Sequence, residues 1–240
     1  MKQQHKTETE YNYKGSMIHA SEGLHEVAIG ILNAEHPSGG KHVLDLGCGS
    51  GAFTKRLCDN NFSTTSVDIL LDSFNLNTVA LEIDLNSNFS ETLSVKHYDA
   101  IVALELIEHL ENPLGFLRQL KSLTSDDTIL IISFPNIYLH YAIKSFIYNG
   151  TFVNWNIHQY WHTGHQTIMT DWLFEQHLKK VGLAVSDKLF CAPVEFPSVW
   201  YKKIYNKLFF LLVKVISPSI SKQARLSDVV LYKIMLEKSH

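Results

Sequence analysis

Short apolar runs alternate along this chain with stretches in which apolar residues recur every three or four positions. The apolar runs predict seven strands, at 43–46, 64–68, 79–85, 98–105, 128–134, 183–190 and 227–237. The periodic stretches predict helices at 21–36, from 53 onward, and at 112–123, 171–182 and 200–216. Because strands and helices alternate, we expect an α/β fold, in which a doubly wound, mostly parallel sheet forms a single domain over residues 1–240.

Residues suited to capping support several of these helix boundaries. Ser21 is expected to cap the first helix, and Asn112 to cap the helix at 112–123 with Pro113 in its first turn. Thr170 or Asp171 is expected to begin the helix that Gly182 ends.

Three segments lie outside the regular alternation. Residues 1–40 are expected to form a helical extension, whose first 15 residues are polar, flexible and unlike a signal peptide. Residues 135–169 follow the fifth strand and are rich in aromatic residues and histidine, which favours a lid over a ligand at the carboxyl edge of the sheet. A packed insertion with incidental aromatic residues is the alternative. Residues 191–227 form a helical insertion before the last strand.

The composition narrows the class of protein and of partner. With 21 Lys and Arg against 24 Asp and Glu, the net charge of −3 makes nucleic acid an unfavourable main partner. The three cysteines, Cys48, Cys58 and Cys191, have neither a disulfide pattern nor a metal-binding spacing. No stretch approaches the roughly 18 apolar residues that a spanning helix needs, so we expect a cytoplasmic protein.

The most informative stretch is VLDLGCGSGAF, at 43–53, where a strand turns into a helix through three alternating glycines. Such a loop presents bare backbone to a ligand. The spacing of Gly47 and Gly49 also satisfies a loose dinucleotide pattern, as in a nicotinamide-dependent oxidoreductase. Asp45 argues against that class of ligand, because a carboxylate before the loop repels a pyrophosphate and attracts a cation.

The pattern Asp-x-Gly-x-Gly-x-Gly resembles motif I of the class I S-adenosylmethionine methyltransferases. The resemblance implies a Rossmann-like methyltransferase sheet and S-adenosylmethionine as cofactor, held at its methionine end by Asp45, Gly47, Gly49 and Gly51. Asp68, at the tip of the second strand, is placed to accept the ribose hydroxyls. Asp84 lies where the family binds the adenine amino group, and Glu82 is the alternative if the strand register slips.

A second pattern, Glu-x-x-Glu-His at Glu105, Glu108 and His109, follows the fourth strand. It resembles the Mg²⁺-binding motif of ubiquinone-pathway O-methyltransferases and of small-RNA 3′-terminal 2′-O-methyltransferases, in which a further histidine, here His165, completes the metal site. Carboxylates and imidazoles are reasonable ligands for such an ion. The other interpretation is that His109 acts without a metal as a base or positioning residue, with Glu105 as the second catalytic candidate.

We therefore expect a methyltransferase that acts on an oxygen of a small-molecule acceptor: a quinone precursor, a sugar or a lipid-linked metabolite. The alternatives are a metal-assisted RNA 3′-terminal 2′-O-methyltransferase and a non-catalytic partner subunit that binds S-adenosylmethionine. An RNA enzyme needs a basic groove, of which the charge balance gives little sign.

The predicted helix at 200–216 is amphipathic and basic. Lys203, Lys207 and Lys214 align on one side, and a broad apolar face lies opposite, made of Ile204, Leu208, Leu211, Leu212 and Val215. Such a helix fits peripheral contact with the inner face of an anionic membrane, cover over the active site, a dimer contact, or packing on its own domain.

Overall fold

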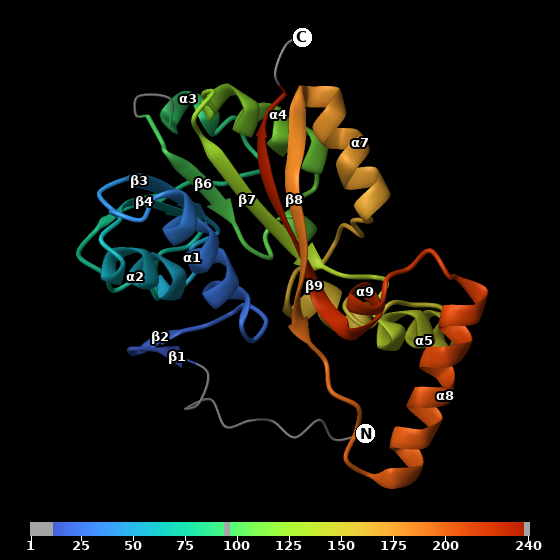
Figure 1. Cartoon of the computed structure of the whole chain (residues 1–240). Coiled ribbons are helices and arrows are strands. Elements are labelled where there is room, and N and C mark those ends of the chain that lie inside the picture. The colour runs from blue at the N-terminus through green and yellow to red at the C-terminus, as the bar shows by residue number, and fades with distance from the viewer. Residues whose placement is uncertain (1–11, 94–96, 238–240) are drawn as a thin grey trace.

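The computed structural model describes residues 12–93 and 97–237. A seven-stranded sheet in the order β5-β4-β3-β6-β7-β9-β8 crosses the molecule, with helices on both faces (Figure 1). The strands are β3 (His42–Leu46), β4 (Ser63–Asp68), β5 (Val79–Glu82), β6 (Ala100–Ala103), β7 (Ile129–Pro135), β8 (Leu183–Pro193) and β9 (Ser227–Leu236). Neighbours among β3 to β7 pair in parallel, whereas β9 lies antiparallel between β7 and β8. The doubly wound, mostly parallel sheet is confirmed.

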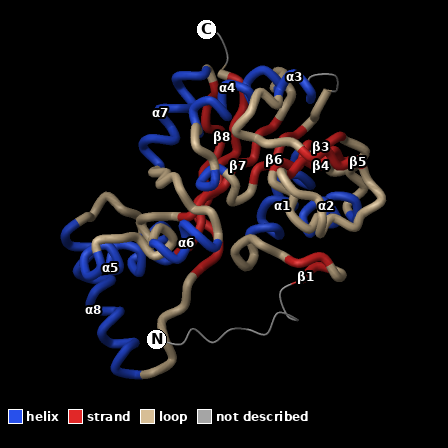
Figure 2. Tube along the Cα trace, turned by 180° about the vertical axis from the view of Figure 1, so that it is seen from behind, coloured by secondary structure: helices blue, strands red, loops and turns tan. Residues whose placement is uncertain are grey.

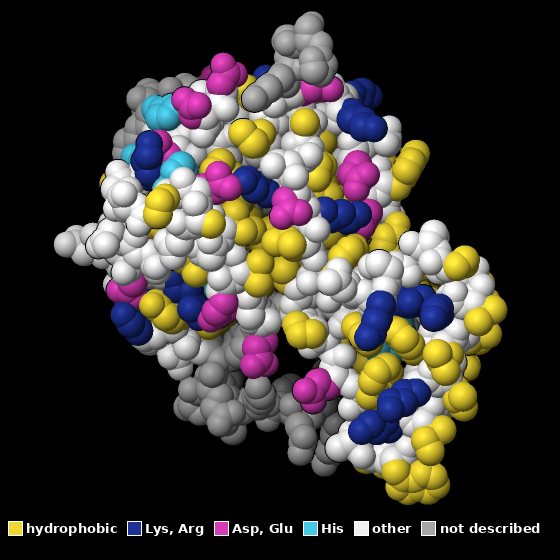
Figure 3. Space-filling model, viewed as in Figure 1, with side chains coloured by type: hydrophobic (Ala, Val, Ile, Leu, Met, Phe, Trp, Pro, Cys, Tyr) yellow, Lys and Arg dark blue, Asp and Glu magenta, His cyan; other side chains and the backbone are white. Residues whose placement is uncertain are grey.

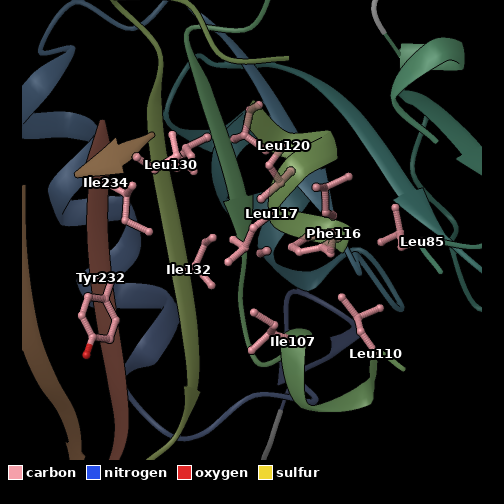
Figure 4. Close-up of a cluster of buried hydrophobic side chains, with 14 of the residues drawn as sticks. Leu85, Ile107, Leu110, Phe116, Leu117, Leu120, Leu130, Ile132, Tyr232 and Ile234 are labelled. Carbon is pink, nitrogen blue, oxygen red and sulfur yellow. The ribbon is translucent and has the colours of Figure 1, made fainter. Parts of the chain in front are cut away.

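Each face of the sheet has its own apolar core. One core packs α1 (Leu24–Glu35) and α2 (Ala52–Asp59) on the sheet, and the other packs α3 (Ser90–Leu93), α4 (Pro113–Leu123) and α7 (Asp171–Val181). Figure 4 shows the second core, where Leu117 and Leu120 of α4 lie toward Leu130 and Ile132 of β7.

Two of the predicted caps are confirmed. The Asn112 side chain accepts a hydrogen bond from the Gly115 N–H at 2.9 Å, and the Thr170 hydroxyl accepts one from the Leu173 N–H at 3.1 Å. The cap predicted at Ser21 is wrong, because Gly23, with a φ of 82°, precedes α1 and Ser21 binds elsewhere.

The third strand is shorter than predicted. β5 ends at Glu82, and the chain then turns at Asp84, whose side chain accepts a hydrogen bond from the Asn86 N–H at 2.8 Å. At the other end of the chain, β1 (Asn12–Tyr13) and β2 (Ser16–Met17) form a small hairpin. The flexibility expected of the first 15 residues otherwise falls on 1–11, outside the described residues.

The two insertions form a helical lobe beside the carboxyl ends of the strands (Figures 1 and 2). We define this lobe as residues 136–170 and 196–227. It holds α5 (His140–Asn149), α6 (Ile157–His162), α8 (Trp200–Ile216) and α9 (Lys222–Leu226). Hydrogen bonds join α5 to α8, from Lys144 to Asn206 at 2.9 Å and between the hydroxyls of Tyr148 and Tyr205 at 2.7 Å. No described helix is long and apolar enough to cross a membrane.

Candidate active site

The glycine loop lies between β3 and α2. Gly47, Gly49 and Gly51 have φ values of 73°, 51° and 82°, in the left-handed region that side chains rarely adopt. At Gly51 a Cβ atom would also lie 2.9 Å from carbon atoms of Phe74 and Leu76. Glycine is required here by both the backbone conformation and the available space.

A cavity of about 540 Å³ opens over this loop, within the size range of small-molecule sites. Asp45, Gly47, Gly49 and Asp68 all line it, as the sequence predicts for a cofactor site. Gly51 and Asp84 are absent from its lining, because Gly51 faces Phe74 and Leu76 while Asp84 lies in the exposed turn after β5. A direct role for Asp84 at the adenine amino group stays a prediction.

The two acidic residues differ in environment. Asp45 is buried and accepts a hydrogen bond from the Thr54 hydroxyl at 2.6 Å, and burial raises the pKa of its carboxyl group to about 6. Asp68 is only half-buried and accepts a hydrogen bond from the Gly49 N–H at 2.7 Å. Asp68 therefore also fixes the glycine loop, a role that the sequence did not reveal.

Glu105 lies in the cavity wall two residues after the end of β6 and has a φ of 47°, which is unusual for a residue with a side chain. Its N–H donates to the backbone oxygen of Ser133 at 3.2 Å and to the Ser133 hydroxyl at 3.0 Å. Such a conformation costs of order 1–3 kcal/mol and persists where the surroundings enforce it. Burial raises the pKa of the Glu105 carboxyl group to about 7.

The segment before α1 closes one side of the cavity, where Met17, His19 and Ala20 contribute to the lining. The backbone N–H and the hydroxyl of Ser21 both donate to the Glu105 carboxyl group, at 2.6 and 3.1 Å. Sequence reasoning missed this contact because it assigned Ser21 to a helix cap.

Glu108, His109 and His165 form a compact cluster, with one candidate ligand atom from each within 4.8 Å of the others. Glu108 is fully buried, and neither carboxylate oxygen accepts a hydrogen bond from another described residue. Burial, followed by the neighbouring Glu105, raises the pKa of Glu108, whereas burial lowers the pKa of both histidines. The structure thus brings together three of the four predicted metal ligands. Glu105, the fourth, is directed to Ser21 instead.

Backbone pairing places His165 in this cluster. The N–H groups of Gln166 and Thr167 donate to the Glu108 carbonyl oxygen at 3.0 and 2.9 Å, which lays this segment along η1 (Ile107–His109). The ring of His165 then lies 4.8 Å from that of His109, centroid to centroid.

A second cavity of about 280 Å³ adjoins the first and shares His19, Ala20, Glu105, His109 and His165 with it. Asp228 of β9 and Asn154 of the helical lobe also line it. Sequence reasoning missed Asp228, since nothing in its local sequence distinguishes it from an ordinary strand residue. His162, Thr163 and His165 show that residues 135–169 contribute to the cavity walls, and closure of that segment as a lid stays a prediction.

The strand order, with its one antiparallel strand next to the edge, and the glycine loop between two acidic residues are those of the class I S-adenosylmethionine-dependent methyltransferases. A sequence model of the family described as "Methyltransferase domain" matches residues 20–187, which is more than half of the chain. The chain belongs to this methyltransferase family.

Individual relatives match part of the chain, and solved structures share its fold. The chain is 34% identical over 100 residues to the "Ubiquinone biosynthesis O-methyltransferase" of Rickettsia typhi, an alignment that covers 39% of this chain and 41% of the relative. It spans about half the length, or less, of the curated relatives that it matches. A SAM-dependent methyltransferase from Archaeoglobus fulgidus superposes with a TM-score of 0.61 at 17% identity, over 88% of this chain and 94% of the other. The plantazolicin methyltransferase BamL, solved with S-adenosylhomocysteine, gives 0.59 at 16% identity, over 90% and 86%.

Proposed function

We propose that this protein transfers the methyl group of S-adenosylmethionine to an oxygen atom of a small-molecule acceptor. The observation that carries this proposal is that the two adjoining cavities share Glu105, His109 and His165. The larger cavity, over the glycine loop, suits the cofactor, and the smaller one suits the acceptor. Glu105, His109 and His165 can each handle a proton and lie where the two cavities meet, as does the exposed His19.

The fit of the cofactor rests on the donor set around the larger cavity. Asp68 is placed to accept from hydroxyl groups, and Asp45 to offset positive charge at the methionine end. Bound S-adenosylmethionine supplies an electrophilic methyl group, whose bond to sulfur breaks as the bond to the acceptor oxygen forms. The walls contribute by holding the two reactants in contact and aligned, an effect worth up to roughly 7–11 kcal/mol in favourable cases.

The acceptor hydroxyl must also lose its proton. Burial, followed by the neighbouring His165, lowers the pKa of His109, while hydrogen bonds that the ring donates to the backbone of Gly164 and Thr163 raise it. The net shift is downward, which favours the neutral ring that can accept a proton. General-base catalysis of this kind contributes roughly 10²–10⁴-fold to the rate. His109 is therefore the proposed base.

A divalent cation is a second way to activate the hydroxyl, and Glu108 is the observation that favours it. A buried carboxyl group without a donor from another described residue is costly, and a cation bound by Glu108, His109 and His165 removes that cost. Such an ion, when bound, lowers the pKa of a coordinated hydroxyl. Glu105 would complete the set by leaving Ser21.

The names of the curated relatives support an oxygen acceptor among quinone precursors, and sugars and lipid-linked metabolites are the other acceptor classes. The test is incubation with methyl-labelled S-adenosylmethionine and acceptors that differ only in the target group: a dihydroxybenzene ring, the matching aminophenyl ring and the matching thiol. We expect an O-methyl product by mass spectrometry, together with S-adenosylhomocysteine. Transfer only to nitrogen or sulfur would contradict the proposal.

A further inference from the structure

The net charge of −3 conceals a strong segregation of charge along the chain. The helical lobe (136–170 and 196–227) contains none of the 24 Asp and Glu residues and seven of the 21 Lys and Arg residues. These are Lys144, Lys202, Lys203, Lys207, Lys214, Lys222 and Arg225. A basic lobe is therefore attached to a strongly acidic body, and Figure 3 shows basic and hydrophobic side chains intermingled on the visible face of the lobe.

Helix α8 exposes its apolar residues to solvent. Only Asn206, Phe209 and Val213 of this helix are buried. The residues that the sequence assigned to an apolar face are 50–77% exposed, namely Ile204, Leu208, Leu211, Leu212 and Val215. The alternative that this face packs on its own domain is therefore wrong for the described structure. The alternative that α8 covers the active site is also wrong, since no residue of α8 lines either cavity.

Two tryptophan side chains of the helical lobe are also exposed. Trp200 begins α8 and Trp161 lies on α6, and each is 72% exposed. Tryptophan and tyrosine favour the boundary between lipid and water, because their rings are apolar with one polar group. At 17 residues, α8 is about 25 Å long, and a helix with this mixture of lysine and leucine lies in a membrane surface rather than across it.

We propose that the helical lobe docks on an anionic lipid bilayer, with the apolar side chains of α8 inserted among the headgroups and its lysines at the level of the phosphates. Charge complementarity supports this occupant, since each lysine near an anionic leaflet strengthens binding while the acidic body is repelled and so oriented away. RNA would also attract the lysines, but it would leave Leu208, Leu212 and Val215 in water.

Docking has a consequence for the site. The lobe carries a continuous series of ring contacts from α5 to the cluster: Phe146 to Phe152, Phe152 to Trp155, and Trp155 to His165, with centroids 4.9, 6.3 and 6.1 Å apart. The lobe that docks on the lipid through α8 thus also contributes Asn154 and His165 to the wall of the smaller cavity. Docking itself does not depend on the proposed reaction.

The test is co-sedimentation of the full chain with phosphatidylglycerol-containing vesicles and with pure phosphatidylcholine vesicles. We expect binding to the anionic vesicles only, weakened by salt. The variant Lys203→Glu/Lys207→Glu should bind at least about thirtyfold more weakly. Its matched control, Lys179→Glu/Lys180→Glu, makes the same charge change at exposed lysines on α7 and should stay within about twofold of the unmodified protein.

A second variant tests insertion. Leu208→Ser/Val215→Ser keeps every charge and should lower vesicle binding about tenfold or more. Circular dichroism and calorimetry with S-adenosylmethionine verify that each variant is folded, separately from any assay of turnover. Absence of binding to both vesicles would overturn the proposal. A concentration-dependent dimer that Leu208→Ser/Val215→Ser abolishes would also overturn it, because a second copy of the chain would then cover α8. So would binding to a single-stranded RNA oligonucleotide that is lost in Lys203→Glu/Lys207→Glu and kept in Leu208→Ser/Val215→Ser.

Discussion

Ser21 and Glu105, 84 residues apart in sequence, are joined by two hydrogen bonds from the Ser21 N–H and hydroxyl to the Glu105 carboxyl group. The contact fastens the segment before α1 across the cavity and occupies a carboxyl group that the sequence assigned to a metal ion. The Ser21 donors compete with a metal ion for this carboxyl group, so substitution of Ser21 distinguishes the two uses of Glu105.

Ser21→Ala should lower the free energy of unfolding by about 1 kcal/mol, because one hydrogen bond is lost while the backbone N–H remains. If Glu105 is a metal ligand, the same change should strengthen Mg²⁺ binding in calorimetry, since one of the two donors that compete for its carboxyl group is gone. Unchanged Mg²⁺ affinity would remove Glu105 from the ligand set.

Asp68→Ala should weaken binding of S-adenosylmethionine by about 2 kcal/mol, because it leaves the ribose hydroxyls without an acceptor and the Gly49 N–H without its partner. We expect micromolar affinity, roughly −8 kcal/mol, for the unmodified protein and no binding of NAD by calorimetry. Asp72→Ala, at an exposed carboxylate nearby, is the control for the loss of charge. Equal dissociation constants for the two variants would show that Asp68 does not bind the ribose hydroxyls.

Affinity for S-adenosylmethionine should rise up to about tenfold between pH 5 and pH 7. The pKa of Asp45 is raised to about 6, and the cationic ligand favours the ionised carboxylate, so binding below that pH requires release of a proton. In the protein without ligand, the effect of pH on stability has the opposite sign. At pH values between 3.8, the usual pKa of an aspartate, and about 6, folded Asp45 keeps a proton that the unfolded chain has lost. The contribution of Asp45 to the free energy of unfolding therefore falls as the pH rises through this range. Asp45→Asn should abolish the pH dependence of binding, and a slope that persists in this variant would assign it to another group.

Glu108→Gln should stabilise the protein without metal by about 1–3 kcal/mol at pH 8, because an amide of the same shape replaces a buried carboxyl group with no donor from another described residue. Thermal denaturation with and without Mg²⁺ completes the measurement. The melting temperature of the unmodified protein should rise with Mg²⁺, and that of Glu108→Gln should not. If neither Mg²⁺ nor Mn²⁺ changes the melting temperature of the unmodified protein, Glu108 is not a metal ligand.

His109→Ala should lower kcat by about 10²-fold or more and leave the affinity for S-adenosylmethionine nearly unchanged, because the lost group acts on the acceptor proton. His158→Ala, on an exposed histidine that lines neither cavity, should retain activity. Treatment with EDTA separates the two roles: activity lost and then restored by Mg²⁺ identifies a metal ligand, whereas activity indifferent to EDTA identifies a base. Near-normal turnover by His109→Ala would exclude both.

Local patterns along the chain were sufficient to predict the features that depend on neighbouring residues. The periodicity of apolar positions specified the α/β alternation, since side chains repeat every two residues on a strand and every 3.6 on a helix. The glycine loop with Asp45, the acidic residue Asp68 at the next strand end and the caps at Asn112 and Thr170 are likewise local patterns. Each follows from backbone conformation or from hydrogen bonds within a few residues.

The folded structure was needed to show which distant groups meet. It directed Ser21 to Glu105, left Asp84 in an exposed turn, and brought His165 to His109 through backbone bonds between its segment and Glu108. It also left the apolar face of α8 exposed, where the helical pattern alone allowed burial, cover or contact with a partner. The physical reason is common to these cases: periodicity shows that a face is apolar or that a carboxylate lies at a strand end. What lies opposite depends on how the rest of the chain folds around it.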